Sequence, residues 1–107
     1  MKYKVLIADQ TENDIINIYN YIAQHDSIEN ADYVFANIEK NCLSLHLLPN
    51  RGHLPPELKY IGMLEYREIH FKPYRIIYRI IDSTVYVHSV LDGRQNLQIQ
   101  LEHRLLR

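Results

Sequence analysis

Apolar residues in the first half of the chain recur at the spacing of two amphipathic helices. The first helix is predicted at about residues 11–24, and the second follows Ser27 and ends before Pro49, which cannot continue a helix. Thr11 followed by Asp14 resembles a capping box that would start the first helix. Because the link between the two helices is very short, they should form an antiparallel hairpin.

Three runs of β-branched and aromatic residues in the second half predict an antiparallel meander, because only two residues separate each run from the next. The runs are Tyr66–Phe71, Tyr74–Ile81 and Thr84–Leu91. An earlier apolar run, Tyr3–Ala8, predicts a further strand, and the i+4 spacing of Leu97, Leu101 and Leu105 suits a short final helix. The expected fold is a single α+β domain, residues 1–107, in which the helix hairpin packs on one face of a small antiparallel sheet.

Side chains alternate between the two faces of a strand, and this divides the predicted sheet into an apolar face and a mixed face. The helix hairpin should cover the apolar face, which holds Ile69, Phe71, Ile76, Tyr78, Ile80, Val85 and Val87. The opposite face should stay open to solvent and display Glu68, His70, Lys72, Arg75, Arg79, Tyr86 and His88. Strict alternation also places Val90 on the open face. It turns Arg67 toward the core, where we expect an ion pair or hydrogen bonds to helix carbonyls.

Charge and composition narrow the choice of partners. The net charge is −1 and the pI is about 6.6, whereas domains built mainly to hold nucleic acid usually have a pI above about 9. Residues 1–64 contain 5 Lys+Arg against 8 Asp+Glu, and residues 65–107 contain 7 against 5, so an anion-binding surface should lie in the second part. The start of the chain lacks a signal-peptide core, no apolar run reaches the roughly 20 residues of a membrane span, and a single cysteine favours the cytoplasm.

The spacing of the histidines and the single cysteine predict no metal site, and no cofactor is expected. The chain has six histidines, but no two of them have the i, i+4 spacing of a helical metal site, and Cys42 has no second cysteine to join it. Cys42 is expected to be a small core residue. His70 and His88 would stand on the outer two of three strands, roughly 10 Å apart, too far to share one ion.

Four motifs, in this order and with these gaps, resemble the RelE/ParE superfamily of bacterial toxins from type II toxin-antitoxin modules. They are the glycine, proline and glutamate of Gly52–Leu58, then Tyr66–Ile69, Tyr74–Arg79 and Val90–Arg94. The resemblance covers nearly all of the chain. It implies either of two activities: RelE-like members are metal-independent ribonucleases that cut messenger RNA in the ribosome, and ParE-like members poison DNA gyrase. It also implies a cognate antitoxin, and a toxin dimer held with two antitoxins.

The family's two arginines carry over onto Arg75 and Arg94, and both could contact a phosphate bidentately. The C-terminal tyrosine of RelE-like enzymes does not carry over, since Gln98 and Gln100 stand in its region. Arginine is too basic to act readily as a general base, so a ribonuclease here would need a histidine such as His88.

The sequence therefore favours a ParE-like gyrase poison of the kind found in plasmid-stabilising modules, acting without catalysis of its own. The predicted target-binding surface consists of Arg75, Arg79, Tyr86, His88 and Arg94. The alternative is a RelE-like ribonuclease with catalytic residues Arg75, Arg94 and His88. A third possibility is a module that binds its antitoxin and has lost toxicity.

Overall fold

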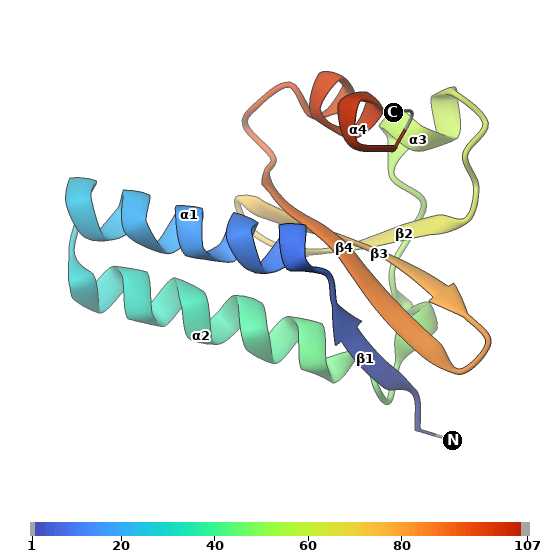
Figure 1. Cartoon of the computed structure of the whole chain (residues 1–107), viewed down its shortest axis with the longest axis horizontal. Coiled ribbons are helices and arrows are strands. Elements are labelled where there is room, and N and C mark those ends of the chain that lie inside the picture. The colour runs from blue at the N-terminus through green and yellow to red at the C-terminus, as the bar shows by residue number, and fades with distance from the viewer. Residues whose placement is uncertain (1, 106–107) are drawn as a thin grey trace.

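The computed structural model describes residues 2–105, and its centre is a four-stranded sheet (Figure 1). The strands are β1 (Lys4–Ile7), β2 (Tyr66–Phe71), β3 (Tyr74–Ile81) and β4 (Thr84–Asp92), and they lie in the order β1-β4-β3-β2. The meander β2-β3-β4 is antiparallel, as predicted, and β1 joins its β4 edge in parallel. The α+β prediction is confirmed, with a sheet that is mixed rather than wholly antiparallel.

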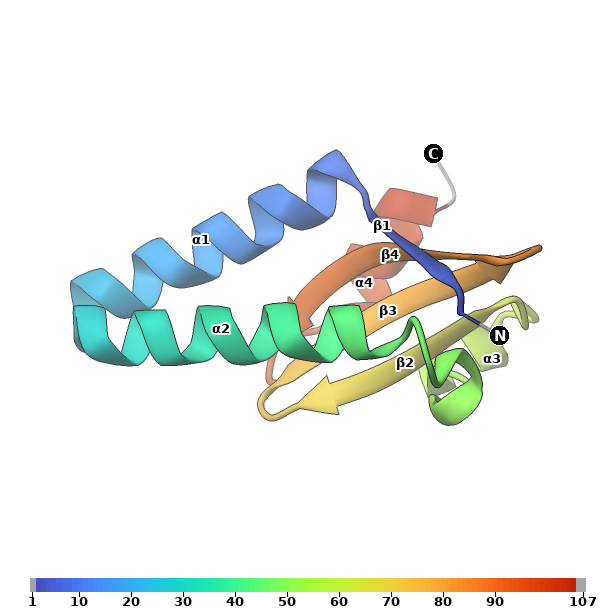
Figure 2. The same ribbon diagram turned by 90° about the horizontal axis from the view of Figure 1, so that it is seen from below.

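The helix hairpin covers one face of this sheet. Helices α1 (Asp9–His25) and α2 (Ile28–Ser44) lie side by side and extend well beyond the strands (Figures 1 and 2). Between hairpin and sheet lies the first core, which includes every sheet residue predicted for this face. Cys42 belongs to this core and is fully buried, as expected.

Of the two hairpin helices, only α2 starts as predicted. The Ser27 hydroxyl accepts a hydrogen bond from the backbone N–H of Asn30 at 3.0 Å, a true N-cap. Helix α1 begins earlier than expected, after Ala8. The predicted capping box is wrong, because the Thr11 hydroxyl donates to the Val87 carbonyl at 2.9 Å and so fastens α1 to β4.

The opposite sheet face is not open, and here the prediction is wrong. Two short helices, α3 (Pro56–Tyr60) and α4 (Leu97–Leu105), lie against it on the side away from the hairpin (Figure 2). They enclose a second core, made of Leu58, Tyr66, Ile77, Leu91, Leu97 and Leu101. Tyr66, Ile77 and Leu91 give this face enough apolar surface for two short helices to pack on. The face was predicted to be open because charged residues alternate with these apolar ones.

A β-bulge in β4 explains a second error. Ile77 pairs with Ser89 but Tyr78 pairs with Val87, so His88 is an extra residue in β4. The extra residue reverses the alternation beyond it. Val90 therefore enters the first core, and Leu91 the second, contrary to the strict alternation assumed from the sequence.

The long connection between α2 and β2 is held against the sheet by buried hydrogen bonds. The Tyr78 hydroxyl donates to the Pro49 carbonyl at 2.6 Å and accepts from the Gly52 N–H at 3.1 Å. A Cβ at Gly52 would lie 2.6 Å from the Glu68 carbonyl oxygen, so no larger residue fits there. Arg67 reaches the same segment and donates to the Gly52 carbonyl at 2.9 Å, which matches the predicted carbonyl partner in kind but not in its helical location.

Candidate functional site

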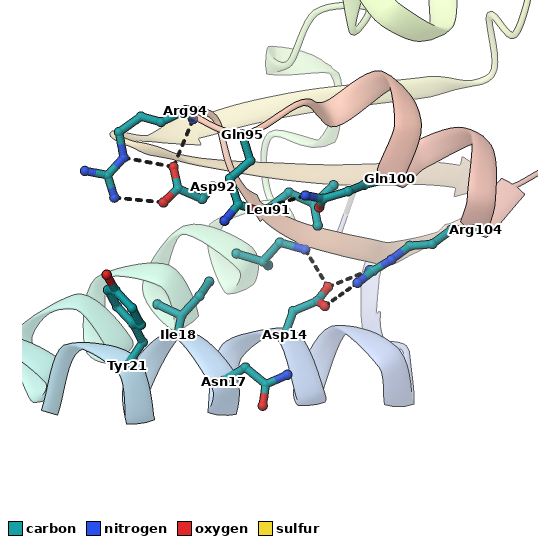
Figure 3. Close-up of a pocket in the computed structure, with 11 residues that line it drawn as sticks. Asp14, Asn17, Ile18, Tyr21, Leu91, Asp92, Arg94, Gln95, Gln100 and Arg104 are labelled. Carbon is teal, nitrogen blue, oxygen red and sulfur yellow. Dashed lines mark hydrogen bonds and ion pairs between the residues drawn. The ribbon is translucent and has the colours of Figure 1, made fainter. Parts of the chain in front are cut away.

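A polar pocket of about 350 Å³ lies between α1 and the segment that runs from the end of β4 into α4 (Figure 3). Asp14 and Arg104 close one side of it. The guanidinium of Arg104 donates to both carboxylate oxygens of Asp14, at 2.6 and 2.8 Å, and one of these oxygens also accepts the Val90 N–H at 3.1 Å. This network ties α4 to both α1 and β4.

Arg94 stands at the other side of the same pocket, immediately after β4 (Figure 3). Its guanidinium donates to both oxygens of Asp92, at 3.0 and 2.7 Å, and its backbone N–H donates to the same carboxylate at 2.9 Å. The adjacent guanidinium lowers the pKa of Asp92. Arg94 is exposed, but its charge is balanced by its own neighbour.

Arg75 on β3 is bound between two carboxylates. It donates to both oxygens of Glu57 on α3, each at 2.7 Å, and to both oxygens of Glu68 on β2, at 2.6 and 2.8 Å. Its side chain is only 15% exposed. The hydrogen bonds from Arg75 lower the pKa of Glu57, and the two carboxylates raise the pKa of Arg75. The predicted outward-facing arginine is therefore largely enclosed.

A shallow second pocket, of about 280 Å³, brings Arg75 and Arg94 together with His70 and Lys72. The approach is possible because Gly93 lies between them: a Cβ there would be 3.1 Å from Cδ of Arg75 and 2.9 Å from the Pro73 carbonyl. Three basic side chains, those of Lys72, Arg75 and Arg94, thus line one depression together with His70. We call it the β3–β4 end pocket.

Arg79, Tyr86 and His88 do not line this pocket. Arg79 and His88 lie against Tyr66 instead, and Tyr86 lies beside Arg79. The guanidinium carbon of Arg79 lies 5.9 Å from the centre of the Tyr66 ring, and Tyr86 is its partner across β3 and β4. The ring of His88 lies 5.7 Å from that of Tyr66. Because Arg75 and Arg79 are four residues apart on one strand, their Cα atoms lie roughly 13 Å apart. The structure divides the predicted surface in two.

His88 is poorly suited to be a catalytic base. It is half-buried, its ring nitrogens contact the Gln10 amide at 3.2 and 3.3 Å, and Nδ1 lies 2.8 Å from the Ser89 hydroxyl. Burial, followed by the nearby charge of Arg104, lowers the pKa of His88. Its ring nitrogens are thus engaged by Gln10 and Ser89 within the fold itself.

A family model described as "ParE toxin of type II toxin-antitoxin system, parDE" matches residues 5–97. The chain belongs to the ParE toxin family. It is a toxin of a type II toxin-antitoxin system. Among curated proteins no sequence matches this ParE-family toxin significantly, and none of the helices in residues 2–105 is long and apolar enough to cross a membrane.

Solved structures share the fold of this ParE-family toxin at low sequence identity. The chromosomal ParDE system of P. aeruginosa is similar with a TM-score of 0.71 and 14% identity, covering 85% of this chain and 96% of that one. The RelBE2 toxin-antitoxin complex of Mycobacterium tuberculosis gives 0.64 and 18%, covering 86% and 92%. An arginine-to-alanine double mutant of the E. coli toxin RelE, in its free state, gives 0.62 and 17%, covering 94% and 93%.

The sequence did not predict the roles of Glu57, Glu68 and His53 around Arg75, nor that of the Asp14–Arg104 pair at the first pocket. Glu57 was visible only as part of a motif, Glu68 was expected on an open surface, and His53 lies in the long connection. In the fold, the backbones of His53 and Glu68 pair through two hydrogen bonds, of 3.1 and 2.8 Å, which bring the connection beside β2. No local spacing in the sequence indicates this contact, because it depends on how the connection folds back.

Proposed function

We propose that this ParE-family toxin acts by binding a protein target, DNA gyrase, without catalysing a reaction itself, and that a cognate antitoxin neutralises it. The observation that carries the proposal is the pairing of the predicted phosphate-binding arginines. Arg75 is held by Glu57 and Glu68, and Arg94 by Asp92, so three carboxylates offset the positive charge of the β3–β4 end pocket.

Cleavage of RNA through its 2′-hydroxyl places different demands on a site. It needs a base, an acid, and positive charge free to stabilise the phosphorane. Here an incoming phosphate would have to displace carboxylates from arginines that already make short, charge-assisted hydrogen bonds. Gln98 and Gln100, which cannot shuttle a proton, stand in the region where RelE-like enzymes are expected to place a tyrosine. Binding of a protein surface requires none of these groups.

One observation supports the alternative, a RelE-like ribonuclease. One pocket is lined by His70, Lys72, Arg75 and Arg94. In a ribonuclease, His70 would therefore act as the base, a role that the sequence analysis gave to His88. Its Nε2 atom lies 2.8 Å from Oε1 of Glu68, an arrangement that could orient the ring. In that case the target would be messenger RNA in the ribosome.

Expression of the toxin without an antitoxin distinguishes the two targets. We expect trapped gyrase–DNA cleavage complexes, with intact ribosomal messages. Messages cut in phase with codons, together with unaffected gyrase, would overturn the proposal and support the ribonuclease. Growth inhibition with neither effect would point to another target, and no inhibition at all would leave a module that only binds its antitoxin.

Two variants test the site itself. Arg94→Ala should reduce toxicity, because the exposed guanidinium lies at the rim of both pockets. Arg51→Ala is the matched control, since Arg51 is also an exposed arginine but bonds to Ser44 and lines neither pocket. His70→Ala separates the activities: it should abolish any cleavage of messages, which needs a base, but should at most weaken the poisoning of gyrase, which needs none. Undiminished toxicity of Arg94→Ala would contradict the site assignment.

The antitoxin is proposed to bind the apolar groove along α1 and α2. Exposed Ile16 and Phe35 line a pocket of about 280 Å³ there, with Ile15 beneath and the carboxylates of Glu12 and Glu39 at the rim. An antitoxin segment with apolar side chains flanked by Lys or Arg would match this surface in both shape and charge. Two such complexes joined through a toxin or antitoxin dimer would give the heterotetramer that the family resemblance implies.

A further inference from the structure

Two histidines and a glutamate converge on one point beside β2. His53, Glu68 and His70 each direct one potential metal-ligand atom to the same place, and these atoms all lie within 4.8 Å of one another. Nε2 of His70 is 2.8 Å from one carboxylate oxygen of Glu68, and Nε2 of His53 is 3.4 Å from the other. The two imidazole rings meet edge to face, with centres 5.2 Å apart.

The three groups differ in exposure in a way that suits an ion arriving from solvent. The Glu68 side chain is 1% exposed, whereas His53 is 61% and His70 38% exposed. The Glu68 carboxylate is thus held inside the fold, whereas the two imidazole rings face solvent and have room to rotate. An ion midway between two atoms 4.8 Å apart lies about 2.4 Å from each, so small ring rotations reach the usual Zn–N distance of about 2.0–2.1 Å.

Arg75 and Glu57 surround the Glu68 carboxylate with hydrogen bonds of the kind that orient metal ligands. Arg75 donates to both Glu68 oxygens and orients the carboxylate, as outer hydrogen bonds do for metal-ligating groups. Glu57 in turn neutralises Arg75 through two hydrogen bonds. Glu57, Glu68 and Arg75 together carry a net charge of −1 before any ion binds, which offsets the positive charge of Lys72 in the neighbouring β3–β4 end pocket, while Arg94 there is neutralised by Asp92.

We propose that His53, Glu68 and His70 bind a divalent transition-metal ion, with Zn²⁺ as the best fit. Two imidazole nitrogens and one carboxylate favour Zn²⁺ and its neighbours over Ca²⁺ or Mg²⁺, which prefer oxygen ligands. The ion would join the connection after α2 to β2, immediately beside the Glu57–Arg75 pair. Its role is structural, and its binding is independent of which target the toxin attacks.

Titration calorimetry of the untagged full-length chain with Zn²⁺ tests the site. We expect one ion per chain with micromolar or tighter affinity, and a rise in the unfolding temperature with added Zn²⁺, because the ligand binds only the folded state. His53→Ala and His70→Ala should each weaken binding at least about tenfold and remove most of the thermal shift. Both side chains are exposed, so the metal-free variants should retain the unfolding temperature of the wild type within a few degrees.

The matched controls are His25→Ala and His103→Ala, two exposed histidines outside the cluster, which should bind Zn²⁺ like the wild type. Absence of saturable Zn²⁺ binding to the wild type would overturn the proposal. Equal binding by His53→Ala, His70→Ala and the controls would overturn it too, because the ion would then be held elsewhere. Preference for Ca²⁺ or Mg²⁺ in competition would contradict the ligand chemistry.

Discussion

At the scale of single residues, the Tyr78 hydroxyl makes the contact that fixes the long connection. Tyr78→Phe leaves the Pro49 carbonyl and the Gly52 N–H without this buried partner. We expect a loss of about 1–3 kcal/mol in the free energy of unfolding, the usual cost of unsatisfied buried polar groups. Urea denaturation measures it, with Tyr60→Phe, an exposed tyrosine, as the control. Equal stability of the two variants would show that water replaces the hydroxyl.

Cys42 gives a second prediction at this scale. Burial against the apolar core, and to a smaller extent the charge of Glu39, raises the pKa of the Cys42 thiol to about 12. Since the thiolate is the reactive form, labelling of the folded protein should stay negligible from pH 7 to about pH 9. Labelling should become fast only in denaturant. Rapid modification of the native chain near pH 8 would contradict the burial of Cys42.

At the scale of elements, α4 depends on packing rather than on its own helical propensity. An isolated helix of this length is marginal in water, but Leu97 and Leu101 are buried against the sheet. Leu101→Ala should cost about 2–5 kcal/mol and detach α4 locally. Amide hydrogen exchange should then accelerate over residues 97–105, while α1 and α2 remain protected.

The control for α4 is Ile99→Ala, because Ile99 lies on the same helix but is exposed. It should leave exchange nearly unchanged. Equal acceleration throughout the chain in Leu101→Ala would mean that α4 unfolds only together with the whole domain.

The bulge in β4 shows where prediction of an element fails. Alternation assigned β2 and β3 correctly because each residue of these strands has one partner across the pair. In β4, the extra residue at His88 shifts the remainder of the strand by one position. Nothing in the local sequence indicates this shift. The hydrogen bond between Asp14 and the Val90 N–H, which comes from another element, helps to stabilise it.

At the scale of the whole molecule, the projecting hairpin offers an apolar groove for a partner. Ile16→Asp places a charge where Ile16 is 51% exposed and beside the Glu12 and Glu39 carboxylates. We expect antitoxin affinity to fall by tenfold or more, about 1.4 kcal/mol or above, with the fold intact. Calorimetry with purified antitoxin measures the change.

Ile99→Asp makes the same change on α4, on the opposite side of the sheet, and should leave antitoxin binding unchanged. If both variants bind normally, the groove is not the antitoxin site. If both lose binding, the antitoxin reaches α4 as well.

The sequence by itself determined the helix hairpin, the three-stranded meander, the final helix and the apolar face of the sheet, but neither α3 nor the parallel pairing of β1 with β4. These features follow from local periodicity and from links too short to permit another topology. The family followed from motifs along the chain and is confirmed by the family model. The resemblance to the family also singled out Arg75 and Arg94; the two share the β3–β4 end pocket, and their role in binding a target stays a prediction.

Only the tertiary structure decided what those arginines contact. Glu57 lies 18 residues from Arg75, and Asp14 lies 90 residues from Arg104, so neither ion pair leaves a trace in local spacing. The same holds for His53 beside Glu68, and for the two short helices that cover the supposedly open face. Periodicity reports which side of an element is apolar. The free energy of burying distant surfaces against each other decides which charges end up as neighbours.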